Sequence, residues 1–465
     1  MNPILHADSY KLSHSTGGMY PDGITGQWAY GEARIHGHNV VVFGGQMLAM
    51  KLADNPVLPA DVERAQYFAE KHGEPFNREP WDIIVNEYGG HRPITIRAIP
   101  DGEVVPSRVP IYTVESNDER IPMLPSYMET EIQRGFWYPT TVASLDRQAY
   151  SGFKARYEAT GADLGLLPFA LHDFAGRGVT CGEQAEIGGA AHLIYFLGSD
   201  TMEGVEAANY YYKHDMSGFS VPATEHSVQT AWGPDRQKEY LETVIKNHGA
   251  RNGIVSLVID GYDTTKCVEL LCAPDMVELV KATGAKVVFR PDSDDPFKLV
   301  PKILQAQVDA YGYTVTDKGF KTPKNVGLLW GDGIDRETAV QLLSHIATHG
   351  FAANSIVFGS GGALLQKMNR DTFKFAQKLS AIKRDGIWTP CNKVTPGKES
   401  KGGRVSTMRY LNGFGQTSYR TYDVDKEKPD WRKNEYDAME IIYKNGNLLH
   451  LTDMAAVRAR ALADL

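Results

Sequence analysis

The sequence predicts an α/β protein in which a barrel of parallel strands is joined to a second, β-rich domain. From about residue 165, short apolar runs that end in polar or glycine-rich clusters alternate with helical segments. This alternation is typical of parallel βα units. After about residue 385 the helical segments stop and short strand-like runs return. The length of 465 residues exceeds one typical domain and agrees with such a division.

The segments at the two ends of the chain differ from the middle. Residues 1–150 mix a turn signal at 20–23 with strand-like runs at 40–43 and 94–97, and residues 59–72 have a helical pattern. Towards the end of the chain, residues 404–410 and 438–443 are strand-like. The ends therefore favour short strands and turns rather than repeated βα units.

Seven candidate strands make up the middle of the chain. Each is followed by a charged or glycine-rich cluster, and in a barrel the catalytic groups lie at the carboxyl ends of the strands. A doubly wound sheet is the alternative, but it would bind its ligand at the one point where the strand order reverses rather than at seven strand ends. The candidate strands are residues 169–171, 192–197, 220–222, 253–259, 286–289, 325–330 and 355–358.

Composition excludes several classes of protein. The formal net charge is −8, which argues against nucleic acid as the main partner, because phosphate backbones need a basic surface. The four cysteines form no Cys-x-x-Cys pair, and so few in a long chain indicate a reducing compartment. No signal peptide and no apolar run of membrane-spanning length is present. We therefore expect a soluble, cytoplasmic protein without a membrane partner.

A glycine-rich turn is the candidate phosphate site. Residues 359–362 follow a strand and precede a helix expected over 363–379, so that Gly361 and Gly362 would let the backbone approach an anion. A tight turn that needs glycine for its dihedral angles is an equal alternative. Arg370 lies about 12 Å further along such a helix, so it is either a solvated charge or serves another site, for example in a partner subunit.

Arginine and carboxylate side chains follow two other strands. Arg290 offers a fork for phosphate, and Asp292 could hold a ribose hydroxyl or a metal. Gly331 and Asp332 could form a second contact with a sugar. A structural ion pair and an ordinary turn are the alternatives.

Histidine and aromatic side chains complete the candidate chemistry. His226, beside Glu225 and with Asp260 on a later strand, could be a general base or a phosphoryl acceptor, although a lone histidine is usually structural. Phe174 lies in a polar loop where a flat ligand could stack, whereas Tyr10 alone is unremarkable. Together the residues indicate a barrel enzyme that acts on a phosphorylated sugar or a nucleotide, and they lead no further.

The ordered set of motifs resembles the nicotinamide phosphoribosyltransferases, which are type II phosphoribosyltransferases. Single motifs are weak, but their order along nearly the whole chain is highly specific. The resembling segments are residues 8–11, 137–143, 172–178, 198–201, 221–227, 290–293, 331–333, 359–367 and 370–371.

The resemblance implies an irregular α/β barrel, residues 151–384, beside a β-rich domain built from both chain ends, residues 1–150 and 385–465. It implies a homodimer with active sites at the interface. The reaction would join nicotinamide to phosphoribosyl pyrophosphate and release pyrophosphate. Magnesium would accompany the pyrophosphate rather than occupy a protein-only metal site, and ATP hydrolysis would improve the yield.

The resemblance also implies roles for single residues. Phe174 and the partner subunit's Tyr10 would sandwich the pyridine ring, and Asp200 would accept a hydrogen bond from its amide. The remaining assignments are Arg177 and Arg290 for pyrophosphate, Asp292, Gly331 and Asp332 for ribose, Gly361, Gly362 and Arg370 for the 5′-phosphate, and His226 with Asp260 for phosphorylation by ATP.

The chain departs from the family pattern at Ala175, Gly176, Asp294, Asp295 and Ala363, which puts the pocket wall and the strand-end geometry in doubt. A nicotinate phosphoribosyltransferase is the closest alternative, and Asp200 separates the two because a nicotinate carboxylate would meet a like charge there. A non-catalytic homologue that acts as a binding protein is a second alternative. An aldolase-like barrel is a third, but none of the seven strand ends carries the lysine that it needs.

Overall fold

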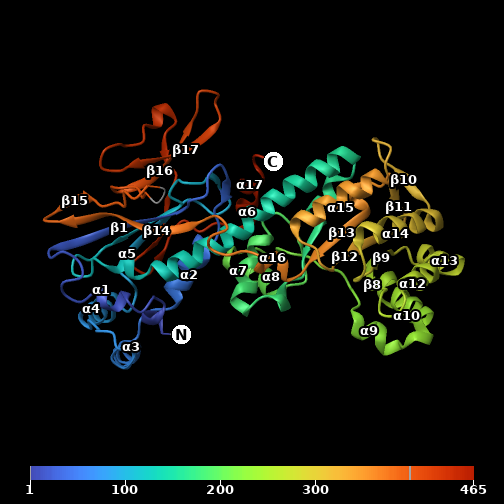
Figure 1. The fold of residues 1–465 in the computed structure, drawn as a ribbon, viewed down its shortest axis with the longest axis horizontal. Helices are drawn as coiled ribbons and strands as arrows, with labels where there is room; N and C mark the ends of the chain where they lie inside the picture. Colours follow the sequence, from blue (N-terminus) through green and yellow to red (C-terminus); the bar gives the residue numbers. More distant parts are fainter. Residues whose placement is uncertain (1, 397–398) are drawn as a thin grey trace. The chain divides into compact units, whose positions relative to one another are not determined.

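A computed structural model describes residues 2–396 and 399–465, and the chain divides into two compact units (Figure 1). The sequence predicts divisions near residues 150 and 384, whereas the units divide after Ser144 and after Lys367. Unit 1 comprises the described part of Met1–Ser144 with Tyr210–His214 and Met368–Asp464, and unit 2 comprises Leu145–Asn209, Asp215–Lys367 and Leu465.

A seven-stranded sheet forms the centre of unit 1. Three N-terminal strands form its middle, two C-terminal strands lie on each side of them, and every neighbouring pair is antiparallel. This sheet confirms a β-rich domain built from both ends of the chain. The strands in spatial order are β15 (Ile387–Pro390), β14 (Phe375–Arg384), β1 (Ile24–Ala33), β5 (Tyr112–Ser116), β3 (Ile94–Ala98), β19 (Glu440–Lys444) and β20 (Asn447–Leu448).

Strand β14 explains why unit 1 begins again before residue 384. It pairs with β1 along its whole length, from Ala33 opposite Phe375 to Ile24 opposite Arg384. Because these hydrogen bonds join it to the N-terminal strands, the strand belongs to unit 1. The other described strands of unit 1 are β2 (Asn39–Val41), β4 (Val104–Pro106), β16 (Val405–Leu411), β17 (Thr417–Asp423) and β18 (Tyr436–Asp437).

The helix expected over residues 59–72 is confirmed as α3 (Pro59–His72). Proline suits the first position of the helix, where a backbone N–H would have no partner within the helix. The Asp61 carboxylate accepts the Leu58 N–H at 2.9 Å. Gly73 ends the helix with φ +87°. The other helices that begin in unit 1 are α1 (Lys11–His14), α2 (Gly45–Asp54), α4 (Glu79–Tyr88), α5 (Leu124–Tyr127), α6 (Glu129–Thr160) and α17 (Met454–Leu462).

A parallel sheet forms the centre of unit 2 (Figure 1). Its strands are apolar and largely buried, as expected for a parallel sheet covered on both faces. The strands in spatial order are β7 (Gly198–Ser199), β6 (Leu171–Asp173), β13 (Ile356–Ser360), β12 (Val326–Trp330), β9 (Lys286–Arg290) and β8 (Ile254–Val258).

The segment from Phe219 to Ala223 joins the two edges of this sheet. Phe219 forms a parallel bridge with Gly198 at one edge, and Ala223 forms one with Ser256 at the other. Residues 220–222 are therefore not a strand as predicted, and the isolated bridges lie at the residues on either side of them. This closure with so few hydrogen bonds makes the barrel irregular, and the predicted fold class is confirmed.

Two elements expected from the sequence differ in the structure. Residues 192–197 are not a strand, because His192 ends helix α7 (Gly182–His192) and β7 begins only at Gly198. The helix expected over residues 363–379 ends at Gln366, since α16 is Gly362–Gln366. The axial estimate of 12 Å for Arg370 therefore does not apply.

Aspartate caps begin several helices of unit 2. Asp263, Asp295 and Asp335 each accept a backbone N–H from the first turn of the helix that follows. None of the described helices combines the length and the apolar character needed to cross a membrane. The other helices of this part of the chain are α8 (Met202–Tyr211), α9 (His226–Trp232), α10 (Gln237–Val244), α11 (Ala250–Asn252), α12 (Thr264–Leu271), α13 (Pro274–Thr283), α14 (Pro296–Tyr311) and α15 (Arg336–Thr348).

Candidate active site

The carboxyl edge of the parallel sheet carries most of the predicted site residues. Because all its strands run in the same direction, the residues that follow them gather at one edge. Phe174 and Arg177 follow β6, Asp200 follows β7, Asp260 follows β8, Arg290 ends β9 with Asp292 beyond it, Gly331 and Asp332 follow β12, and Gly361 and Gly362 follow β13.

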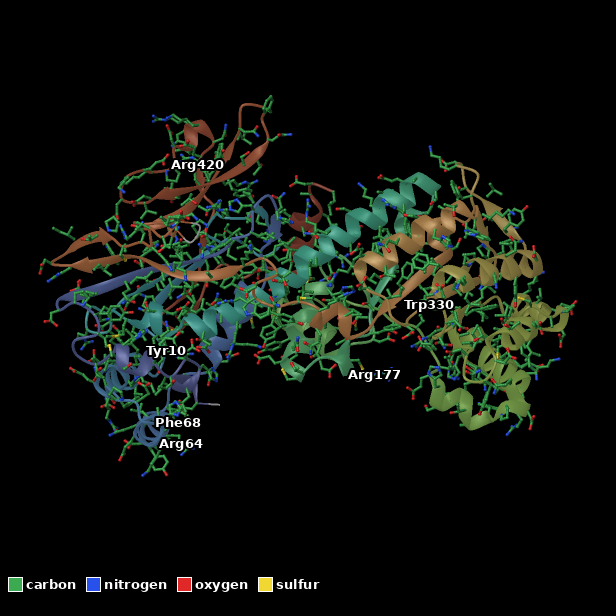
Figure 2. All side chains as sticks on the ribbon, viewed as in Figure 1. Tyr10, Arg64, Phe68, Arg177, Trp330 and Arg420 are labelled. Atoms are coloured by element: carbon green, nitrogen blue, oxygen red, sulfur yellow. The ribbon has the colours of Figure 1, made fainter. Side chains whose placement is uncertain are left out.

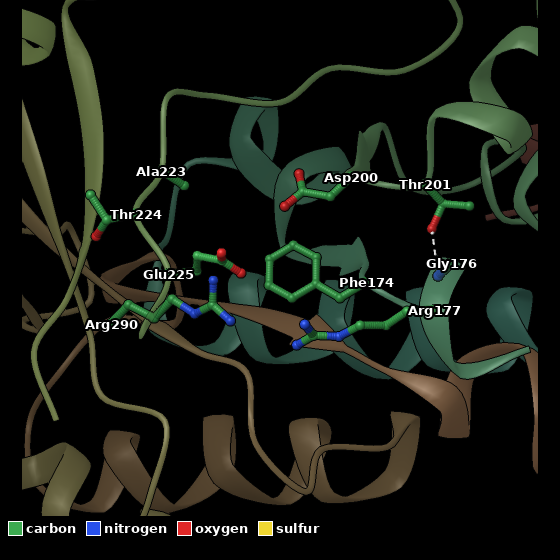
Figure 3. A pocket seen from close by; sticks show the side chains of 9 residues that line it. All are labelled: Phe174, Gly176, Arg177, Asp200, Thr201, Ala223, Thr224, Glu225 and Arg290. Carbon is green, nitrogen blue, oxygen red and sulfur yellow. Dashed lines mark hydrogen bonds between the residues drawn. The ribbon is translucent and has the colours of Figure 1, made fainter. Parts of the chain in front are cut away.

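A pocket of about 340 Å³ opens at this edge (Figure 3). Four of the predicted residues line it, namely Phe174, Arg177, Asp200 and Arg290. The sequence reasoning did not single out the other lining residues as contacts, although each lies within three positions of a residue that it did name. These additional residues are Gly176, Thr201, Ala223, Thr224 and Glu225.

The Phe174 ring faces the middle of the pocket (Figure 3). Its backbone N–H donates to the Ser360 carbonyl at 2.9 Å, and the Arg290 guanidinium carbon lies 5.2 Å from its ring centroid. Gly359 makes this position possible, because a Cβ there would lie 2.1 Å from the Phe174 ring. An aromatic face and a guanidinium group therefore border the same space.

The Asp200 carboxylate lies beside the Phe174 ring, on the side away from the Arg177 guanidinium group (Figure 3). The Ser220 hydroxyl donates to its Oδ1 at 2.5 Å. The Asp200 backbone N–H donates to the Asp173 carbonyl at 2.9 Å, which holds the residue beside β6. An oriented carboxylate in a pocket with an aromatic wall can accept a hydrogen bond from a ring substituent that carries N–H groups.

Arg290 and Asp292 form an ion pair, with Nη2 to Oδ2 at 3.4 Å. The Nε of Arg290 is buried and has no hydrogen-bond partner among the described residues, so it is a donor available to a ligand. Burial raises the pKa of Asp292, while Arg290 lowers it and the Asp260 carboxylate raises it further. Gly331 allows a close approach here, because a Cβ on it would lie 2.9 Å from Asp292 Oδ1.

His226 is the first residue of α9, and its Nε2 lies 3.0 Å from Asp260 Oδ1. His226 also acts on the pKa of Asp292, as do Asp260 and Asp332. The histidine, the three carboxylates and Arg290 therefore form one electrostatic group.

The glycine-rich turn after β13 packs against the turn that carries Arg177. A Cβ on Gly178 would lie 2.7 Å from the Gly362 Cα, so the two backbones touch. Lys367, just beyond α16, pairs with Asp335 at 2.6 Å. The predicted phosphate turn and the Arg177 turn are thus neighbours, and both rely on glycine for their contact.

Two predicted residues lie in unit 1 rather than in unit 2. Tyr10 precedes α1 and is 52% exposed, and its hydroxyl donates to Asp8 at 3.1 Å (Figure 2). Arg370 is an exposed loop residue beside Asp371. The structure therefore does not join Tyr10 and Arg370 to the residues around the pocket.

A cationic cluster around Arg370 was missed by the sequence reasoning. Burial lowers the pKa of Lys378, and the charges of Arg34, Arg370 and Lys393 lower it further, while Glu129 raises it. Arg34, Arg370 and Lys393 therefore lie close enough to act on the charge of Lys378, with the Glu129 carboxylate in the same group. The sequence gives little signal for it, since these residues come from distant segments that only β1 and β14 bring together.

Comparisons with known proteins show the family of this chain. The model of the nicotinate phosphoribosyltransferase (NAPRTase) family matches residues 169–427, which is more than half of the chain. The chain belongs to this family. A second model, described as the nicotinamide phosphoribosyltransferase N-terminal domain, matches residues 2–96.

Relatives and solved structures extend the family comparison. A nicotinamide phosphoribosyltransferase from Xanthomonas campestris pv. campestris is 39% identical, over 99% of this chain and 98% of the relative. One from Acinetobacter baylyi is 30% identical, over 81% and 77%. The crystal structure of human nicotinic acid phosphoribosyltransferase matches with a TM-score of 0.63 and 15% identity, over 98% of this chain and 93% of that one. At that identity the structural match supports the type II phosphoribosyltransferase fold alone.

Proposed function

We propose that the protein is a pentosyltransferase that makes nicotinamide mononucleotide and pyrophosphate from nicotinamide and phosphoribosyl pyrophosphate. The observation that carries this proposal is the pocket in which the Phe174 ring and the Asp200 carboxylate face the same space. A carboxylate accepts hydrogen bonds from an amide N–H but repels a carboxylate. The relatives named nicotinamide phosphoribosyltransferase support the amide over the acid.

In this proposal the pyridine ring stacks on Phe174 while Asp200 accepts its amide N–H. Arg177 and Arg290 bind the pyrophosphate, with the free Nε of Arg290 as one of the donors. Asp292, Gly331 and Asp332 contact the ribose. Gly361 and Gly362 offer backbone N–H groups to the 5′-phosphate.

The chain's contribution to the reaction is then mainly positioning and charge stabilisation. The ring nitrogen attacks C1 of the ribose as pyrophosphate leaves, so no protein nucleophile is needed at carbon. Negative charge grows on the leaving group, where the Arg177 and Arg290 guanidinium groups would stabilise it. The Asp292 carboxylate lies on the side where the ribose becomes positive.

Magnesium enters with the phosphates in this proposal. Among the described residues, no group of three or more His, Cys, Asp or Glu side chains is placed to hold a metal ion. Phosphate oxygens and water would supply most ligands, with the Asp292 and Asp332 carboxylates near enough to orient that water. When bound, the ion would neutralise charge on the leaving pyrophosphate.

We assign ATP coupling to His226. Asp260 holds Nε2, so Nδ1 is the nitrogen that would accept the phosphoryl group. We further propose that Tyr10 and Arg370, which lie in unit 1, act from the partner subunit of a homodimer. The four cysteines are free, which supports a reducing compartment such as the cytoplasm. A role in NAD salvage follows from the proposed product, nicotinamide mononucleotide.

Product formation tests the proposal directly. The purified full chain is incubated with phosphoribosyl pyrophosphate and magnesium, with nicotinamide or nicotinate, and with or without ATP. We expect nicotinamide mononucleotide from the amide, in a yield that ATP increases. Product from nicotinate alone would support the nicotinate enzyme instead, and no product from either base would favour a binding protein.

A further inference from the structure

We propose that Asp173 and Thr201 are positioning residues that fix the distance between the Phe174 ring and the Asp200 carboxylate. Asp173 immediately precedes Phe174, and Thr201 immediately follows Asp200. Asp173 therefore connects the segment that carries Phe174 to Asp200, and Thr201 connects the segment that carries Asp200 to the turn after Phe174. The inference rests on the proposed function, because it assigns to this pair the recognition of the ring together with its amide.

The Asp173 anchor lies at the end of β6 and is completely buried. Its Oδ1 accepts the Ala175 N–H at 2.7 Å, which bends the chain just after Phe174. Its carbonyl oxygen accepts the Asp200 N–H at 2.9 Å. One residue thus bonds both to the turn that presents the aromatic ring and to the residue that presents the carboxylate.

The Thr201 anchor makes the reciprocal contact. Its hydroxyl accepts the Gly176 N–H at 3.0 Å, drawn as the dashed line in Figure 3. Burial raises the pKa of the neighbouring Asp173 carboxyl group, and the Thr201 side chain lowers it. Thr201 is 2% exposed, so water does not compete for the bond to Gly176.

The surroundings leave the pair little freedom to rearrange. A Cβ on Gly189 would lie 3.3 Å from Asp173 Oδ2 and 2.7 Å from the Gly204 Cα. The backbones of α7 and α8 therefore close over the carboxyl group. Oδ2 has no hydrogen-bond partner among the described residues. Burying a carboxylate oxygen without a hydrogen-bond partner is unfavourable for folding, so packing alone does not explain Asp173. The placement of Phe174 and Asp200 does explain it.

A matched pair of substitutions at Thr201 tests the inference. Thr201→Val keeps the shape but removes the hydroxyl, and Thr201→Ser keeps the hydroxyl but removes a methyl group. Leaving the Gly176 N–H unpaired should raise the KM for nicotinamide by about 5- to 150-fold in the valine variant. The serine variant should remain within about 3-fold of the wild type. The KM for phosphoribosyl pyrophosphate should rise less than that for nicotinamide in the valine variant, because Arg177 follows Gly176 directly.

Two further measurements keep the test decisive. Thermal unfolding of each variant shows whether it is folded, and Asp173→Asn gives a second disruption of the same link if the valine variant is not. Calorimetric titration with nicotinamide measures binding without turnover. If the wild type forms no product, the proposed function fails, yet weaker binding by the valine variant would still support the positioning role. Equal rises in both KM values, or nicotinamide affinity unchanged in a folded valine variant, would overturn it.

Discussion

The Nε2 of His226 lies 3.0 Å from Oδ1 of Asp260, and the two side chains differ sharply in exposure. The imidazole is 49% exposed and the carboxylate only 5%. A buried carboxylate thus orients a ring that remains open to a substrate from outside. This arrangement suits a histidine that is phosphorylated and then dephosphorylated in each cycle.

Replacement of His226 by alanine should abolish ATP coupling but leave uncoupled product formation. We expect ATP hydrolysis to fall by at least about 100-fold. Measuring phosphate release and nicotinamide mononucleotide in the same reaction checks this. The exposed His248 provides the control, since His248→Ala should leave the ratio of the two products unchanged. Full coupling in the His226 variant would contradict the assignment.

Asp200→Ser should shift the preference of the enzyme from the amide towards the acid. The substitution removes a negative charge that a nicotinate carboxylate would meet, and the hydroxyl can donate to that carboxylate. We expect the ratio of kcat/KM for nicotinamide to that for nicotinate to fall by about 10- to 100-fold. If the ratio does not change, Asp200 does not contact the ring substituent.

Asp292→Asn should lower activity and raise stability at neutral pH. Burial raises the pKa of Asp292, so the folded chain holds this proton more tightly than the unfolded chain. The stabilisation that the protonated Asp292 carboxyl group contributes is complete below its pKa in the unfolded chain. It is lost as the pH rises through its pKa in the folded chain. The asparagine variant should therefore melt higher than the wild type at about pH 8, and the difference should shrink towards about pH 4. A lower melting temperature for the variant at the higher pH would contradict this.

The adjacent residues Asp294 and Asp295 should respond to substitution in opposite directions. Asp294 has φ +77°, where glycine is favoured, so Asp294→Gly should stabilise the protein by about 0.5–1 kcal/mol. Asp295 caps α14 by accepting the Phe297 N–H at 3.0 Å, so Asp295→Ala should destabilise it by about 1 kcal/mol. Urea unfolding of both variants measures the two effects. Changes of the same sign would show that the loop adopts another conformation.

Gly359→Ala should weaken nicotinamide binding because the new Cβ would lie 2.1 Å from the Phe174 ring. The ring must move, since the backbone of β13 is fixed by its pairing with β6. We expect the KM for nicotinamide to rise by about 10-fold or more. Gly182→Ala is the control, because nothing lies within 4 Å of a Cβ at Gly182. An unchanged KM in the Gly359 variant would mean that Phe174 does not define the pocket.

The sequence predicts the strand ends well and the connecting segments less well. The runs before Arg290 and Gly331 are β-branched and apolar with clear breaks, and both are strands. Residues 192–197 are equally apolar, but they lie in a turn packed inside unit 2, and short apolar runs do not distinguish these states. The pattern after Gly362 predicts a helix over 17 residues, yet the helix ends at Gln366, and Phe375 to Leu379 pair with β1 as the first part of β14.

The order of the motifs, and hence the family, can be read from the chain alone, because chemistry-bearing residues follow apolar strands in a fixed order. The common pocket of Phe174, Asp200 and Arg290 depends on the fold, since β6, β7 and β9 belong to one parallel sheet that brings distant segments together. The fold also creates the bonds by which Thr201 holds Gly176 and Asp173 holds Asp200. Hydrogen bonds between residues of neighbouring strands leave no periodic signal in the chain, because they depend on which strands are adjacent rather than on local propensity.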